Sequence, residues 1–189
     1  VDLAVRVNDR LARIVDDRPD RFAAFAILPT QVPGAAADEL ERCVDKLGFK
    51  GAMMPGLTDR RFHDREEFWP IFERAAALDV PVYIHPGLPH PAMVEAYLED
   101  YAEDYSVILG PAWGFTIETA TAGLRLVLSG VFDAYPNLQI ILGHLGEGLP
   151  FLIWRIDHSL GGPARPGSKP LAFRDIFCGH FHVTTSGNF

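Results

Sequence analysis

Two histidines end apolar runs that have the composition of buried strands. The run "VYIH" ends at His85, and the run "IILGH" ends at His144. A neutral imidazole binds zinc, manganese or iron, and it also transfers protons near neutral pH. One histidine at a strand end is more often a hydrogen-bonded structural residue. Two histidines at equivalent ends of neighbouring parallel strands, however, face the same opening at the carboxyl edge of the sheet. We therefore predict one site that contains both side chains.

Glu147 follows His144 by three residues in the segment "GHLGEG". Its three glycines permit a tight backbone with positive φ and the close approach of a ligand. A carboxylate here can orient His144 and stabilise its charge, as general acid–base catalysis requires. The alternative is that Glu147 caps the short helix expected directly after it. The residues alone leave both hypotheses open.

A metal site needs three or four donors, and the other strand ends offer few. The segments "AILP", "AMMP" and "TTSG" contain no acid and no histidine. Asp59, His63, Asp64 and His90 fall in expected loops, and we predict that they are solvated polar residues. The strand-end histidines therefore remain the main candidates for metal ligands.

Three further side chains are candidates for contact with a substrate. Arg155 in "WRID" can bind a carboxylate through two hydrogen bonds, or it can form an ion pair with Asp157 or Glu118. Trp113 and Phe115 can stack on a planar substrate or pack in the core. No nucleophile elbow, phosphate-binding glycine loop or paired-cysteine site is present, and "GHLGEG" lacks the spacing of a dinucleotide-binding fingerprint.

Composition favours a globular protein that acts on small molecules. The 189 residues are 48% hydrophobic and 22% charged, with a formal net charge of −8 and no long basic run, which excludes the electrostatic pattern of a nucleic-acid or anionic-membrane binder. No apolar run reaches the roughly 18 residues of a membrane span, and the first residues do not resemble a signal peptide. Cys43 and Cys178 lack paired spacing, which indicates a reducing, cytoplasmic compartment.

Helices and strands alternate along the chain. Gly48 is expected to end one helix and Thr116 to begin another, while Pro70 moves the start of a third to a position after its apparent cap at Asp64. A loop or small helical insertion is expected over 88–112, and a flexible surface loop over 161–170. Periodicity predicts helices over 1–15, 40–47, 64–78, 116–134 and 149–158, and strands over 21–29, 49–56, 80–87, 136–144 and 181–189.

The predicted strands are apolar throughout, so we expect them to be buried on both faces of a parallel sheet in a single α/β domain over 1–189. Periodicity does not distinguish a closed barrel from an open sheet. In both folds the chemistry lies at the carboxyl ends of the strands.

Four segments in order carry a family resemblance, namely "GFKGAMMPG", "DVPVYIHPG", "AWGFTIETATAGLRLVLSGVFDAYPNLQIILGHLGEGLPFLIWRID" and "FHVTTSGNF". They resemble the amidohydrolase-2 group of the amidohydrolase superfamily, most closely its nonoxidative aromatic acid decarboxylases, such as the γ-resorcylate and 2,3-dihydroxybenzoate decarboxylases. The resemblance implies a (β/α)8 TIM barrel that holds one divalent metal ion, zinc or manganese, and that assembles as a dimer or tetramer.

The resemblance also implies roles for single residues. His85 matches the metal ligand at the end of the fifth strand, and His144 with Glu147 matches the active-site histidine and its acidic partner. Phe115 matches an aromatic residue that contacts the substrate, and Arg155 lies in the motif that supports the pocket.

The family pattern extends beyond this chain. Its first strand carries an E-x-H or H-x-H pair of ligands and its eighth an aspartate, so the chain is expected to be an internal portion, about strands three to seven. The expected function is metal-dependent decarboxylation of a hydroxylated aromatic acid by the parent protein. The alternatives are a lactonase-like metal-dependent hydrolase and a noncatalytic fragment that packs against a partner.

Overall fold

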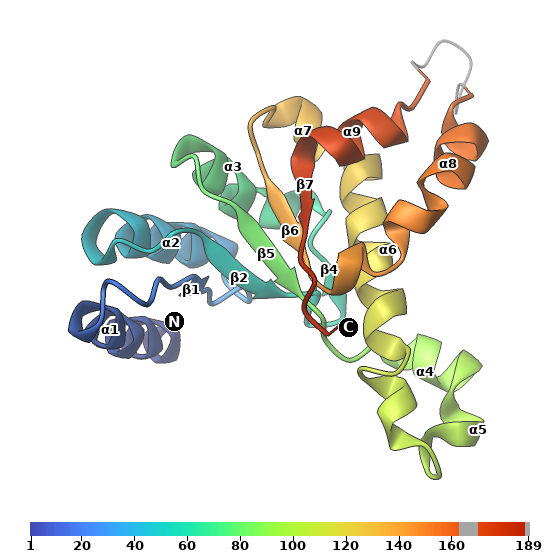
Figure 1. Cartoon of the computed structure of the whole chain (residues 1–189), viewed down its shortest axis with the longest axis horizontal. Helices are drawn as coiled ribbons and strands as arrows, with labels where there is room; N and C mark the ends of the chain where they lie inside the picture. Colours follow the sequence, from blue (N-terminus) through green and yellow to red (C-terminus); the bar gives the residue numbers. More distant parts are fainter. Residues whose placement is uncertain (163–169, 188–189) are drawn as a thin grey trace.

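The computed structural model describes residues 1–162 and 170–187. A parallel five-stranded sheet with the order β1-β2-β5-β6-β7 forms its centre (Figure 1). A separate antiparallel pair, β3 and β4, follows β2. The predicted α/β class with a parallel sheet is therefore confirmed. The strands are β1 (Ala26–Ile27), β2 (Ala52–Pro55), β3 (Leu57–Thr58), β4 (Arg61–Phe62), β5 (Val82–His85), β6 (Ile140–Leu142) and β7 (Phe181–Val183).

Helices connect the strands, because parallel neighbours require a crossover between them. The predicted insertion is helical, and Figure 1 shows α4 and α5 standing away from the sheet at the lower right. The helices are α1 (Asp2–Asp17), α2 (Pro33–Leu47), α3 (Trp69–Ala77), α4 (Pro91–Tyr97), α5 (Glu99–Ala102), α6 (Gly114–Ser129), α7 (Val131–Ala134), α8 (Leu149–Leu160) and α9 (Phe173–His180).

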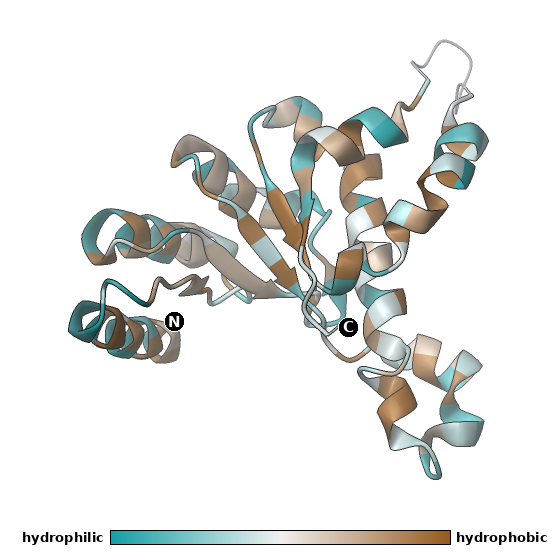
Figure 2. Cartoon of the chain, viewed as in Figure 1, coloured by the Kyte–Doolittle hydropathy of each residue, from teal (hydrophilic) through white to brown (hydrophobic). Residues whose placement is uncertain are grey.

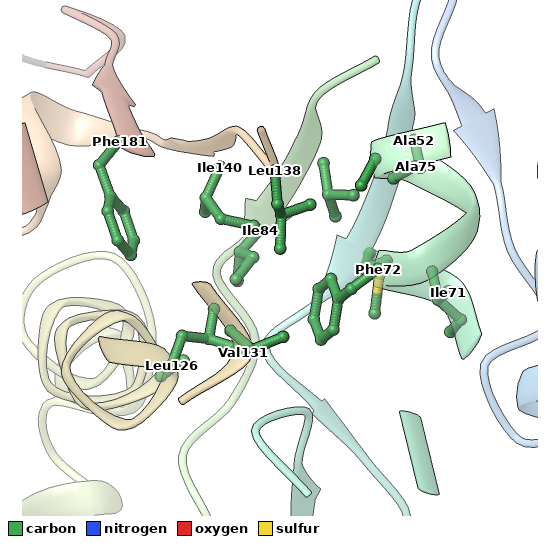
Figure 3. Packing of buried hydrophobic residues seen from close by; sticks show 14 of the residues in the cluster. Ala52, Ile71, Phe72, Ala75, Ile84, Leu126, Val131, Leu138, Ile140 and Phe181 are labelled. Carbon is green, nitrogen blue, oxygen red and sulfur yellow. The ribbon is translucent and has the colours of Figure 1, made fainter. Parts of the chain in front are cut away.

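The core lies between one face of the sheet and the helices. Alternate strand residues such as Ile84 and Ile140 are fully buried, and Figure 3 shows them close to Phe72 of α3, Leu126 of α6 and Val131 of α7. Figure 2 shows hydrophobic residues concentrated on β5 and β6, whereas hydrophobic and hydrophilic residues alternate along the helices.

The other face of the sheet is only partly covered. Met53, Tyr83 and Ile141 alternate with the fully buried strand residues, and each is half-buried. The expectation that both faces are buried is therefore wrong for the described residues. The strands are apolar on both sides, but the helices pack against one side only.

Glycine and proline set two helix boundaries as predicted. Gly48 follows α2 with φ of 70°, a left-handed conformation that suits glycine. Pro70 lies in the first turn of α3, so this helix begins at Trp69, after a short 3-10 turn over Glu66–Phe68.

The expected continuous helix over 116–134 is wrong. Gly130 adopts φ of 83° and separates α6 from α7. Thr116 does not cap the helix, because α6 begins at Gly114 and Trp113 holds the cap position. Leu128, near the end of α6, is 52% exposed.

Other boundaries also differ from the prediction. The strand predicted over 21–29 is reduced to β1, and the strand predicted over 181–189 ends at Val183, with 188–189 outside the described residues. Helix α9 was not expected, although Phe173 and Phe177 are one turn apart and both buried. The predicted surface loop falls mostly on 163–169, outside the described residues.

The outer edge of β1 is satisfied by one side chain of α1. The Asn8 amide donates to the Ile27 carbonyl at 3.0 Å, and the Ile27 N–H donates to Asn8 Oδ1 at 2.9 Å. Asn8 also donates to buried Glu39, which pairs with Arg42.

None of the helices in the described ranges is long and apolar enough to cross a membrane.

Candidate active site

The segment after β6 has a compact left-handed backbone. His144, Leu145 and Glu147 have φ of 51°, 57° and 53°. A non-glycine residue in this region carries strain, which persists only where the surroundings hold it. The Leu145 N–H donates to the Thr184 carbonyl at 2.7 Å, just after β7. A Cβ at Gly146 would lie 2.8 Å from Val183, so glycine is needed where the turn meets β7.

This backbone brings His144 and Glu147 together. The Nδ1 atom of His144 lies 2.5 Å from Glu147 Oε1. The second oxygen of the buried Glu147 carboxylate accepts a hydrogen bond from Thr116 Oγ1 at 2.8 Å. The helix-cap alternative is wrong, because Gly148 holds the cap position of α8 and no side chain caps this helix. Glu147 therefore fixes the imidazole through Nδ1.

His144 and Glu147 line a cavity of about 410 Å³ that lies between the turn after β6, the start of α6 and the start of α8. Its volume lies within the range of small-molecule sites. Phe115, at the start of α6, contributes an aromatic wall to this cavity. The lining residues are Pro111, Ala112, Phe115, Thr116, His144, Leu145, Glu147, Gly148, Phe151 and Gly187.

His85 ends β5, the strand paired with β6, but it does not line this cavity. Its Nδ1 lies 2.8 Å from the Pro86 carbonyl, and its ring stacks on Tyr83 with centroids 6.3 Å apart. A carbonyl can only accept, so Nδ1 carries the proton and the exposed ring keeps Nε2 for another partner. Metal-binding histidines commonly hold their second nitrogen in this way.

The described residues of this chain therefore supply only part of a metal site. His85 is suited to be one imidazole ligand through Nε2. Within the described residues, no three histidine, cysteine or acidic side chains are grouped to hold a metal ion. The predicted acidic and histidine ligands of a first and an eighth strand have no counterpart among them.

Arg155 and Trp113 lie outside the His144 cavity. Arg155 is exposed on α8 and lines a separate cavity of about 780 Å³ with Trp154 and His158. Neither expected ion pair of Arg155 forms within the described part of the chain, and Asp157 instead accepts from the Arg174 backbone N–H. Trp113 is 52% exposed.

From the sequence, Glu118 is expected only as a possible ion-pair partner of Arg155. This expectation is wrong. Its side chain on α6 is 2% exposed and accepts from the Gly87 N–H at 3.4 Å and from the Thr119 hydroxyl at 3.2 Å, both at Oε2. Its Oε1 has no hydrogen-bond partner in the described structure. Burial raises the pKa of Glu118 to about 7, and the nearby Glu147 charge adds to this effect.

Two of the four residues expected to be solvated are not. His63 is 3% exposed, its Nε2 lies 2.8 Å from the Thr58 hydroxyl, and burial lowers its pKa to about 4. Asp64 accepts two hydrogen bonds of 2.8 Å from Arg125. Asp59 is exposed as expected, and His90 is half-buried and accepts from the Ala92 N–H at the start of α4.

The fold and the His144–Glu147 cavity can be compared with known proteins. The family model described as Amidohydrolase, Amidohydro_2, matches residues 3–163. A γ-resorcylate decarboxylase from Rhizobium sp. strain MTP-10005 is 45% identical over 197 residues, which cover 100% of this chain and 59% of the relative. The chain thus spans less than two thirds of the length of this relative.

Solved structures give the same picture. A dihydroxybenzoic acid decarboxylase from Polaromonas sp. JS666, with bound manganese and the inhibitor 2-nitroresorcinol, superposes with a TM-score of 0.87 at 46% identity, over 98% of this chain and 57% of that one. A 5-carboxyvanillate decarboxylase from Sphingomonas paucimobilis gives a TM-score of 0.89 at 36% identity, over 98% and 55%.

Proposed function

This chain belongs to the Amidohydro_2 family of amidohydrolases, and from that premise we propose that its parent protein is a metal-dependent, nonoxidative decarboxylase of a hydroxylated aromatic carboxylic acid. The observation that carries the proposal is the buried Glu147 carboxylate holding the Nδ1 atom of His144 at a cavity with an aromatic wall. Such a site suits a planar acid whose hydroxyl group exchanges a proton with Nε2 of His144.

His85 would be one ligand of the divalent ion, with zinc and manganese the expected metals. When bound, such an ion supplies a template and a Lewis acid for the substrate carboxylate and its neighbouring hydroxyl. The Pro86 carbonyl holds the His85 ring so that Nε2 carries the lone pair.

The proposed reaction exchanges one proton for one carbon dioxide. A proton, which the aspartate expected on the eighth strand of the parent protein would donate, adds to the ring carbon that bears the carboxylate. The bond to the carboxylate carbon then breaks, carbon dioxide leaves, and the electron pair of that bond restores the aromatic ring. His144 stabilises the charge on the ring oxygen, and Glu147 stabilises the imidazolium that forms when His144 takes a proton. Phe115 packs against the ring plane.

Trp113 and Arg155 complete the proposed substrate-binding residues, although both lie outside the cavity.

We further propose a cytoplasmic homodimer or homotetramer. The assembly is supported by Phe151 and Trp154 on α8, which are largely exposed apolar side chains. The reducing compartment is supported by Cys43 and Cys178, which are both unpaired. Light scattering of the full-length protein tests the proposed oligomeric state.

The experiment uses the full-length protein with manganese and 2,6-dihydroxybenzoate in deuterated water. We expect carbon dioxide release and one deuterium atom on the ring carbon that lost the carboxylate, with kcat/KM reduced about 100-fold or more in His144→Asn. His180→Gln is the matched control, because His180 bonds to the Leu138 carbonyl at the opposite end of the sheet. Lactone hydrolysis without carbon dioxide release would instead establish the hydrolase, and no turnover of either substrate class would support the noncatalytic alternative.

A further inference from the structure

One peptide group links Glu118 to His85. The carbonyl of Pro86 accepts from Nδ1 of His85 at 2.8 Å, and the N–H of the same peptide unit, which belongs to Gly87, donates to Glu118 Oε2 at 3.4 Å. This peptide is planar and trans, so its N–H and C=O point in opposite directions. The peptide is therefore held between an acid on one side and an imidazole on the other.

The segments that follow β2 and β5 both contact the Glu118 carboxyl group, through Gly56 and Gly87. A Cβ at Gly56, directly after β2, would lie 2.0 Å from Glu118 Oε1 and 2.3 Å from Oε2. Only glycine allows the acid to approach this closely. The group is almost completely buried, and Oε1 has no partner in residues 1–162 and 170–187. Burying an incompletely bonded carboxyl costs free energy, which a well-packed apolar side chain would avoid.

We propose that Glu118 is a positioning residue for the metal ligand His85, acting through the Pro86–Gly87 peptide. Accepting from the N–H polarises the peptide and makes its carbonyl a stronger acceptor. A stronger acceptor fixes the proton of His85 on Nδ1 and the orientation of the ring, so Nε2 stays free to ligate. Partners beyond the direct ligands commonly change metal affinity 10- to 100-fold when they are removed.

This inference rests on the proposed metal site at His85, and its test measures metal binding without any aromatic acid. The full-length protein is titrated with Mn²⁺, and the free ion is followed by electron paramagnetic resonance. We expect Glu118→Met to raise the dissociation constant about tenfold, and Glu118→Gln, which keeps an oxygen acceptor, to restore it to within about threefold of the wild type. If the wild type binds no Mn²⁺, the proposed function fails; if it binds but Glu118→Met binds equally well, this inference alone fails.

Glu39→Gln separates positioning from general loss of stability. Glu39 is also a buried glutamate with several hydrogen bonds, but it lies in the Asn8–Arg42 network, away from His85. We expect this control to lower the melting temperature without changing the dissociation constant. An equal loss of Mn²⁺ affinity in Glu39→Gln and Glu118→Met would overturn the proposal.

A second pair of variants tests the same hydrogen bond from its donor side, should Glu118→Met fail to fold. Gly87→Pro removes the N–H, whereas Gly87→Ala keeps it, and a Cβ at this position meets nothing nearer than 4.0 Å. We expect Gly87→Pro to weaken Mn²⁺ binding about tenfold relative to Gly87→Ala. Equal affinities of the two variants would contradict the proposal.

Discussion

The His144–Glu147 pair depends on the charge of the carboxylate as well as on its position. In Glu147→Gln the amide oxygen can still accept from Nδ1, but the negative charge that stabilises the imidazolium is lost. We expect kcat of the full-length enzyme to fall about 100-fold with a smaller change in KM, as steady-state kinetics measures. Thr116→Val, which removes one hydrogen bond to Glu147 and keeps its charge, should cost less than tenfold. Equal losses in the two variants would show that position alone matters.

Residues whose partners are close in the chain could be identified from the sequence. His144 and Glu147 are three residues apart in a glycine-rich turn, so their contact could be predicted locally. Glu118 could not be predicted, because Gly56 and Gly87, which surround the acid, come from distant segments. His63 could not be predicted either: its hydrogen-bond partner Thr58 is itself bonded to Thr30, 28 residues away, and this long-range contact leaves no local pattern. Their only signal in the sequence was a titratable side chain close to glycines or aromatic residues.

Gly130 decides where α6 ends and α7 begins. Its φ of 83° strains any residue with a Cβ, although a Cβ there would meet nothing nearer than 3.9 Å. We expect Gly130→Ala to lower the free energy of unfolding by about 1 kcal/mol, as denaturant titration measures. Gly179→Ala in α9 is the matched control, because Gly179 has no positive φ and open space, and should raise the free energy of unfolding by about 0.5 kcal/mol. A loss at both positions would contradict the conformational explanation.

The same glycine explains why the helix over 116–134 was predicted as continuous. Leu126, Val127 and Val131 keep a helical spacing across the break, and all three are buried, so the apolar pattern gives no sign of the left-handed residue. Gly48 and Pro70 were predicted correctly because each coincides with the end or the start of an apolar pattern.

For the whole molecule, two buried groups should give opposite pH dependences of stability. Glu118 has its pKa raised from 4.5 to about 7, so the folded protein holds a proton that the unfolded chain releases, and stability falls as the pH rises across this interval. His63 has its pKa lowered from 6.5 to about 4, so the unfolded chain takes up a proton that the folded protein refuses, and stability falls as the pH drops across that interval.

Each effect amounts to about 3 kcal/mol over its full interval, and the two largely cancel between about pH 4.5 and 6.5. We therefore expect Glu118→Gln to become more stable relative to the wild type as the pH rises from 5 to 7, and His63→Gln to become more stable relative to it as the pH falls from 6.5 to 4.5. Chemical denaturation at several pH values measures both differences. Parallel curves for the variants and the wild type would show that neither group titrates differently on folding.

The paired strands are separated by very different lengths of chain. Ala26 and its partner Ala52 are 26 residues apart and Ala52 and Val82 are 30 apart, whereas Val82 and Ile140 are 58 apart, with the insertion and α6 between them. Closing a longer loop costs more chain entropy and slows the step that needs it. The β1-β2-β5 half should therefore form early, and the join of β5 to β6 late. Because His85 follows from β5 and His144 from β6, a chain in which this join has not formed keeps the strand that carries His85 but has not placed His144 and its cavity beside it.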